Sequence, residues 1–123
     1  MSNKKVYLTN IFSFNCRTNN SEKRAECKET SENAFKLEVT VSRKLAETER
    51  AINFDNLKDV LQKNLVKKLD NQYLDEIVPV KTTCENLVNW MWNEIEPYVE
   101  LMNCQLERVG LWENSTSKAE IIR

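Results

Sequence analysis

The chain has 123 residues, with 18 lysines and arginines against 19 aspartates and glutamates, four cysteines and no histidine. This length predicts one domain over residues 1–123, because a chain of this size buries about two thirds of its unfolded surface in a single core. The balanced charge argues against binding to nucleic acid or to an anionic membrane, since both need a concentrated basic surface. No apolar run approaches the roughly 20 residues that cross a bilayer, and no signal-peptide core follows Met1–Lys5, so we expect a cytoplasmic protein.

The first two predicted elements are strands. Even-numbered positions of the segment Val6–Arg17 are apolar at Val6, Leu8, Phe12, Phe14 and Cys16, interrupted only by Asn10, and Ala34–Ser42 alternates apolar and polar residues. Alternation of this kind is typical of strands with one buried face. The two strands are therefore expected to form a hairpin across the polar segment Asn19–Asn33, which has the length of a functional loop.

Two helices are predicted next. Leucine and valine side chains recur every three or four residues in Phe54–Leu69, which places them on one face of a helix, and Asn53 is a suitable N-cap. A second apolar stripe follows the same period over Thr83–Tyr98. Thr82 and Glu85 have the spacing of a capping box at its start.

The end of the chain predicts a second strand pair. Pro97 is expected to end the second helix, because proline has no amide hydrogen to donate. Val99–Trp112 and Lys118–Ile122 then read as strands around the turn Asn114–Ser117. The order strand, strand, helix, helix, strand, strand indicates an α+β fold, an antiparallel sheet with both helices on one face. Such a sheet has two free edges, which joining several sheets into a barrel would remove.

The four cysteines show no close pair of the kind that nucleates a structural zinc site, and free thiols are the expectation. Cys16, Cys84 and Cys104 are expected to be small buried residues, whereas Cys27 falls in the polar loop. Without histidine, any catalysis must use carboxylates, thiols, lysine or tyrosine. A soft metal shared by Cys16 and Cys27 is a further idea, which the lack of other close ligands disfavours.

Several short segments follow one another along the chain in an informative order and spacing: Phe12-Ser13-Phe14, Cys27, Ile52-Asn53-Phe54, Leu69-Asp70, Tyr73-Leu74, Thr83, Glu85-Asn86-Leu87, Trp90, Trp92 and Trp112-Glu113-Asn114. Together with the element order, they resemble the 6-pyruvoyl tetrahydropterin synthase family, which includes the 6-carboxytetrahydropterin synthases. The resemblance implies a tunnelling fold, in which three subunits join their sheets into a barrel. It also implies that two such trimers stack into a hexamer.

The zinc site of this family is where the sequence departs most. The family holds zinc with three histidines, and the matching positions here are Thr18, Ser31 and Asn33. Neutral hydroxyl and amide groups bind zinc too weakly to replace three imidazoles. The resemblance therefore implies a chain without zinc, and without the Lewis-acid assistance that zinc gives to proton removal from the pterin side chain.

The family's catalytic residues are kept only in part. Cys27 matches the acid/base cysteine and Asp70 the aspartate of an Asp-His pair, but Asn71 stands at the histidine position. An amide cannot accept and return a proton near pH 7. Two interpretations stay open: Cys27 and Asp70 keep a residual catalytic role, or they are a loop thiol and a structural carboxylate at a helix end.

The ligand-binding residues are kept better. Glu113 matches the glutamate whose two oxygens accept hydrogen bonds from the 2-amino group and a ring N–H of the pterin, a strong contact when water is excluded. Thr83 matches a residue whose backbone helps to hold the same ring. The alternatives are a strand-end carboxylate exposed to solvent for Glu113 and helix capping for Thr83.

Two functions follow from the resemblance. The first is a zinc-free protein that binds a pterin or a related heterocycle and has lost synthase activity, either as a homo-oligomer (trimer or hexamer) or in a mixed oligomer with an active relative. The alternative is a metal-independent lyase or aldolase that processes pterins, with Cys27, Asp70 and Tyr73 as proton handlers. Neither function involves nucleic acid or a membrane.

Overall fold

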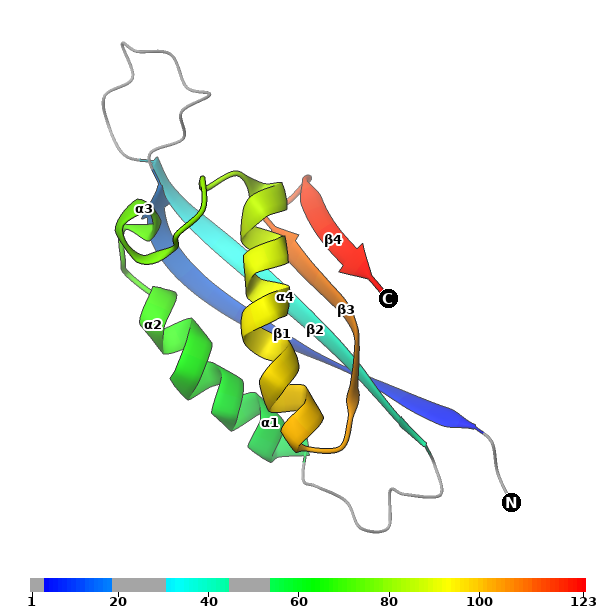
Figure 1. Ribbon diagram of the computed structural model, residues 1–123. Helices are drawn as coiled ribbons and strands as arrows, with labels where there is room; N and C mark the ends of the chain where they lie inside the picture. The colour runs from blue at the N-terminus through cyan, green and yellow to red at the C-terminus, as the bar shows by residue number, and fades with distance from the viewer. Residues whose placement is uncertain (1–3, 19–30, 45–53) are drawn as a thin grey trace.

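The structure is a computed structural model, and it describes three parts of the chain: residues 4–18, 31–44 and 54–123 (Figure 1). Within them, β1 (Lys5–Thr18), β2 (Ser31–Lys44), β3 (Gln105–Trp112) and β4 (Lys118–Ile122) form one antiparallel sheet in the order β1-β2-β3-β4. The predicted α+β fold is therefore confirmed. Both predicted hairpin strands are longer than the sequence indicated, because their backbone pairing continues to Thr18 and Ser31 beyond the apolar residues.

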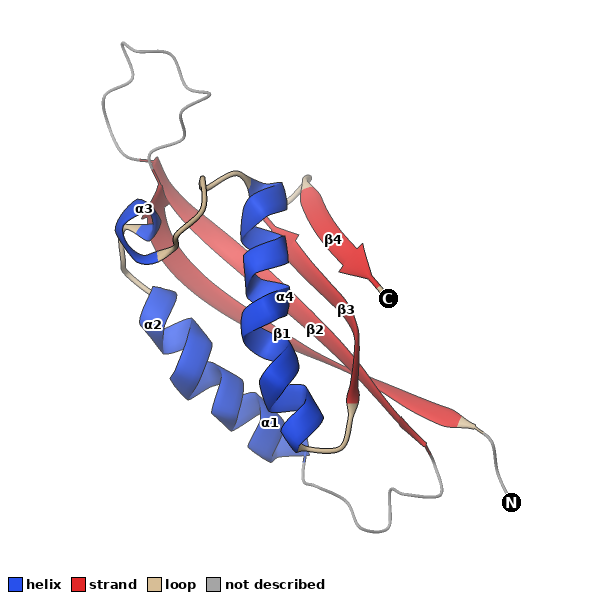
Figure 2. Ribbon diagram, in the orientation of Figure 1, coloured by secondary structure: helices blue, strands red, loops and turns tan. Residues whose placement is uncertain are grey.

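The helices all lie on one face of the sheet (Figure 2). The first predicted helix is confirmed as a continuous helical segment: α1 (Phe54–Leu61), a π-helical stretch η2 (Gln62–Val66) and α2 (Lys67–Leu69). A short helix that the sequence analysis missed, α3 (Leu74–Ile77), connects it to the long α4 (Cys84–Leu101). The predicted cap Asn53 lies outside the described residues.

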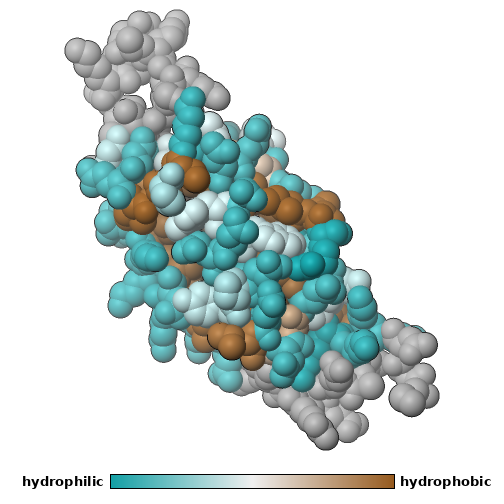
Figure 3. Space-filling view, viewed as in Figure 1, coloured by the Kyte–Doolittle hydropathy of each residue, from teal (hydrophilic) through white to brown (hydrophobic). Residues whose placement is uncertain are grey.

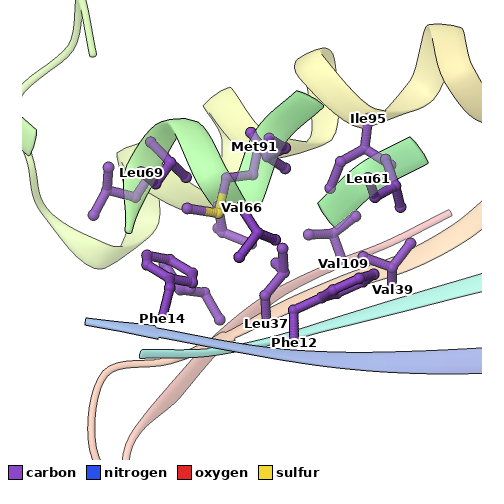
Figure 4. Close-up of a cluster of buried hydrophobic side chains, with 14 of the residues drawn as sticks. Phe12, Phe14, Leu37, Val39, Leu61, Val66, Leu69, Met91, Ile95 and Val109 are labelled. Atoms are coloured by element: carbon purple, nitrogen blue, oxygen red, sulfur yellow. The ribbon is translucent and has the colours of Figure 1, made fainter. Parts of the chain in front are cut away.

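The core lies between the helices and the sheet (Figure 4). Phe12, Leu37 and Leu111 are paired across three neighbouring strands, and all three are buried. Leu61, Val66 and Met91 cover them from the helix side. The parity of the strand residues therefore sets which face of the sheet the helices cover, as the alternation predicts.

The prediction that Pro97 ends the second helix is wrong, and so is the assignment of Val99 to a strand. The helix continues to Leu101 with Pro97 inside it, although a proline within a helix costs about 3 kcal/mol through a lost hydrogen bond and a clash. Val99 is fully buried in the last turn. Burial of this side chain, together with the hydrogen bond from Cys104 N–H to the Val99 carbonyl, offsets part of that cost.

The predicted capping box at Thr82 is wrong, and the N-cap of α4 is one residue later. Thr83, not Thr82, is the N-cap of α4, and its Oγ1 accepts a hydrogen bond from the amide of Asn86 at 3.3 Å. The hydroxyl of Thr82 instead donates to Asp75 Oδ1 at 2.8 Å. Thr82 therefore ties the connection after α3 to α3 itself, a contact that helix-capping patterns do not predict.

The surface over the helices is mostly hydrophilic, with small separate hydrophobic areas (Figure 3). Exposed large apolar side chains also lie on the two edge strands of the sheet: Tyr7 and Ile11 on β1, and Ile122 on β4. None of the helices in the described residues is both long enough and apolar enough to span a bilayer.

Candidate functional site

The three predicted zinc positions lie together at the loop end of the β1–β2 hairpin. The ladder pairs Thr18 with Ser31 and Cys16 with Asn33. Positions 18, 31 and 33 continue the parity of Cys16 and Phe35, which are buried on the helix-covered face. The backbone therefore brings these positions to one place, as the resemblance requires. Cys27 lies outside the described residues, so the prediction for it stays a prediction.

Asp70 and Asn71 form a turn against the edge strand β1. Asp70 Oδ1 accepts a hydrogen bond from the Asn15 amide at 2.9 Å, and the Asn71 amide donates to the Asn15 carbonyl. Both backbone groups of Asn15 that point away from β2 are thus satisfied. Asn71 has φ 60°, a left-handed conformation that asparagine tolerates better than most residues. These contacts give Asp70 a structural role, one of the two interpretations left open by the sequence.

Cys16 is a buried thiol beside this turn. Burial, and to a lesser extent the negative charge of Asp70, raises the pKa of Cys16 from its ordinary value of 9.0 to about 12. The thiol is therefore neutral near pH 7 and is no nucleophile. Because the pKa is raised in the folded state, its contribution to stability is complete below pH 9 and is lost as the pH rises toward 12.

Replacing Asp70 separates its charge from its hydrogen bond. In Asp70→Asn the amide oxygen still accepts from Asn15, so we expect the free energy of unfolding to fall by less than about 1 kcal/mol, whereas Asp70→Ala costs about 1–2 kcal/mol. The pKa of Cys16 should fall in both variants but stay above its ordinary value, since burial is the larger cause. Urea unfolding and thiolate absorbance titration measure the two effects. An unchanged pKa of Cys16 would contradict the assignment.

The start of α4, where Thr83 is the N-cap, lies against the end of β3, which Glu113 follows, and we call this place the corner. The Cys84 thiol donates to the Leu111 carbonyl at 3.5 Å, which joins the first turn of α4 to β3. Burial raises the pKa of Cys84, and the charge of Glu113 raises it further. Glu113 is half-buried, and its amide donates to the Ser117 carbonyl at 3.0 Å, closing the turn to β4. The two predicted ligand-binding residues are therefore neighbours in space.

A polar network beside this corner was not predicted. On the sheet face away from the helices, Trp112 Nε1–H donates to Glu38 Oε1 at 2.9 Å. Lys118 lies 5.1 Å from the Trp112 ring centroid, and its ammonium is 2.7 Å from Glu120 Oε2 and 3.7 Å from Glu38 Oε2. The hydrogen bond with Glu120 raises the pKa of Lys118 and lowers that of Glu120. The network fixes the strand ends that carry Glu113.

This network could have been predicted only if the pairing of residues between β2, β3 and β4 had been known. Gly110 lies between Glu38 and Glu120 in the ladder, and a Cβ there would come within 3.3 Å of the Lys118 side chain. The small residue leaves room for Lys118 to cross the sheet between its two carboxylates. The sequence places charged residues at alternate positions of β2 and β4, but it does not say which of them are paired.

The sequence profile of the 6-pyruvoyl tetrahydropterin synthase family matches residues 7–123. The chain belongs to this family. Its fold is shared with the 6-pyruvoyl tetrahydropterin synthase of Caenorhabditis elegans (TM-score 0.79, 13% identity, covering 98% of this chain and 96% of the other). An uncharacterized protein from Wolinella succinogenes also has a TM-score of 0.79, at 10% identity and coverages of 98% and 99%. The Plasmodium falciparum 6-pyruvoyl tetrahydropterin synthase has a TM-score of 0.73, at 14% identity and coverages of 98% and 99%. None of the curated protein sequences compared with this chain matches it.

Membership of the 6-pyruvoyl tetrahydropterin synthase family allows the corner and the loop end of the β1–β2 hairpin to be compared with the sites that the resemblance implied. The fold is that of the family, while the donor set at positions 18, 31 and 33 is two hydroxyls and an amide. This set does not fit a zinc ion. In the described residues, His, Cys, Asp and Glu side chains also form no group of three that could hold a metal.

Proposed function

We propose that this protein is a cytoplasmic, zinc-free member of the family that binds a pterin, or a heterocycle with the same hydrogen-bonding edge, and has lost zinc-dependent synthase activity. The observation that carries the proposal is the corner, where the first turn of α4, which Thr83 caps, lies beside Glu113. A carboxylate there accepts two hydrogen bonds from an amino group and an adjacent ring N–H, and the backbone at the start of α4 provides further polar groups. The same chain offers no zinc donors at the three matching positions.

We further propose a trimer or hexamer in which a neighbouring subunit completes the pocket. The sheet has free edges at β1 and β4, where Tyr7 is 57% exposed and Ile122 is 57% exposed. Joining the β1 edge of one subunit to the β4 edge of the next would pair the unpaired backbone groups and cover these side chains. A mixed oligomer with an active relative would use the same edges. Native mass spectrometry of the purified protein tests the stoichiometry.

The alternative is a metal-independent lyase or aldolase that uses Asp70 and Cys27, the second of which lies outside the described residues. One oxygen of Asp70 is engaged by the Asn15 amide, a role that needs no catalysis. An assay for turnover of neopterin-type substrates, with Cys27→Ala as the comparison, separates the two functions. Turnover that Cys27→Ala abolishes would establish the enzyme.

Replacing Glu113 by glutamine tests the binding proposal. The variant exchanges one acceptor oxygen for an NH₂ donor that faces the donors of the ligand, and it removes the charge. We expect neopterin to bind roughly 10–100-fold more weakly, since a hydrogen bond to a charged group contributes about 1.5–3 kcal/mol. Quenching of pterin fluorescence during titration measures the Kd.

The matched control for this experiment is Glu85→Gln, because Glu85 is an exposed glutamate in the first turn of α4. It carries the same chemical change close to the corner, and we expect it to bind neopterin as the natural sequence does. Equal affinity of the Glu113→Gln variant and the natural sequence would remove the proposed anchor. A natural sequence that binds no pterin at all would overturn the function.

A further inference from the structure

A hollow with a volume of about 260 Å³ lies at the far end of the sheet from Glu113. We call it the cationic hollow, because Lys5, Arg43 and Lys44 line it. Its lining comes from the start of β1, the end of β2, and the residues around the connection from α4 to β3, where Asn103 and Gln105 contribute amide groups. Figure 1 shows these backbone segments near the N-terminal end of β1. Among the described residues that line the hollow there is no aspartate or glutamate.

Arg43 is the unusual member of this set. Only 7% of the residue is exposed, and its Nε and Nη1 atoms are buried without a hydrogen-bond partner in the part of the chain that the structure describes. A guanidinium is a permanent cation with five N–H donors. Burying such a group without acceptors is strongly unfavourable, so proteins pair buried arginines with carboxylates or other anions. Among the described residues, no anion is therefore paired with these two nitrogen atoms.

The two lysines add to this unbalanced charge. Lys5 and Lys44 are directly opposite each other in the β1–β2 ladder, where like charges destabilise the pairing. The acidic residue bonded nearby, Glu107, accepts a hydrogen bond from Ser42 Oγ at 2.6 Å and does not line the hollow. Two separate features, the guanidinium of Arg43 without an acceptor and the facing pair Lys5 and Lys44, thus indicate that the hollow is suited to an anion.

We propose that the cationic hollow binds a phosphate group, either as the free ion or as the end of a larger molecule. Three cations favour a doubly charged anion over a carboxylate, and the fork of an arginine matches two phosphate oxygens. The volume is below the roughly 300–1,000 Å³ of sites for whole drug-sized ligands, and so suits one small anion.

The proposed site is separate from the pterin-binding corner and does not rest on it. Arg43 is about ten residues of extended β2 from Asn33, roughly 33 Å at the rise of a strand. Glu113 follows Trp112, which pairs with Lys36 near the same distant end of β2. Phosphate binding can therefore be measured whether or not a pterin binds.

The test is calorimetric titration of the full-length protein with inorganic phosphate, phenyl phosphate and acetate at constant ionic strength. We expect phosphate to bind the natural sequence, and Arg43→Met to bind it at least tenfold more weakly. Because Arg43→Met also removes an unpaired buried cation, its melting temperature without phosphate should not fall. Lys44→Met, on an exposed side chain, should weaken binding by about threefold and keeps the test usable if the first variant does not fold. The matched control is Lys36→Met, an exposed lysine on the same strand, with unchanged affinity.

If phenyl phosphate binds as tightly as inorganic phosphate, the ligand of the hollow is the phosphate end of a larger molecule. If only inorganic phosphate binds, the ligand is the free ion. Both results support the proposal. Acetate binding as tightly as phosphate would overturn the phosphate assignment. Equal phosphate affinity of Arg43→Met and the natural sequence, or no heat of binding beyond that of chloride, would overturn the site itself.

Discussion

We expect zinc to raise the melting temperature of a variant in which Thr18, Ser31 and Asn33 are all replaced by histidine. We expect it to leave the melting temperature of the natural sequence unchanged. This result is expected because Thr18 and Ser31 face each other in the ladder and Asn33 lies two residues further along β2. Directly opposite residues of a ladder have Cβ atoms about 5 Å apart, and residues two positions apart on a strand share a face. Three introduced imidazoles are therefore expected to reach one ion. At free zinc 1,000-fold above Kd the variant gains about 4 kcal/mol.

The control for the zinc experiment is Thr18→His alone, which supplies one imidazole and should hold no stoichiometric metal. Elemental analysis after dialysis and melting curves with and without added zinc give the two readouts. One tightly held zinc per chain in the natural sequence would refute the argument from donor chemistry. A triple variant that binds no zinc and whose melting temperature zinc does not change would refute the assignment of the three positions.

Period and parity were enough to predict most of the fold. Strict alternation in Ala34–Ser42 fixed which face of β2 is buried, and Phe12 and Phe14 did the same for β1. A one-residue slip between the strands would move every apolar side chain to the wrong face, so the hydrophobic pattern excludes odd shifts of the hairpin's register. The three-and-four spacing of leucines gave the first helix with the bounds that the structure has.

The errors came from contacts distant in sequence. Pro97 is a helix-ending signal by its own chemistry, and only the burial of Val99 against the sheet explains why the helix continues. Thr82 and Thr83 offer the same hydroxyl one residue apart, so capping patterns could not choose between them. The choice depends on Asp75, which bonds Thr82.

In the candidate site, too, local sequence predicted some features, and contacts between residues distant in sequence decided the others. Family motifs singled out Thr83 and Glu113, and the structure places the elements beside them, α4 and β3, against each other, while their role in ligand binding stays a prediction. Motifs could not reveal that Asp70 bonds the backbone of Asn15, since nothing in the local sequence of either residue indicates the other. The burial of Arg43 could not be predicted for a related reason: an arginine just after the end of a predicted strand is normally exposed, and nothing in its local sequence indicates burial.

Leu37→Ala should lower the free energy of unfolding by roughly 3–5 kcal/mol, a large share of the 5–15 kcal/mol that holds a typical domain together. Leu37 is fully buried on a central strand, with Phe12 beside it on one neighbouring strand (Figure 4) and Leu111 beside it on the other. The strands on either side are fixed by their ladders and the helices cover the face, so the space left by the side chain cannot close. The cost therefore includes a cavity as well as lost burial.

Leu101→Ala is the control for this prediction, because Leu101 is 79% exposed and the same chemical change there should cost less than about 0.5 kcal/mol. Urea unfolding of both variants measures the difference at equal slope. A loss below about 1 kcal/mol for Leu37→Ala would mean that the helix layer settles onto the sheet when the side chain is removed. In that case α4 would not be held rigidly, and neither would Thr83 at its start, so the corner with Glu113 could not be preformed for a ligand.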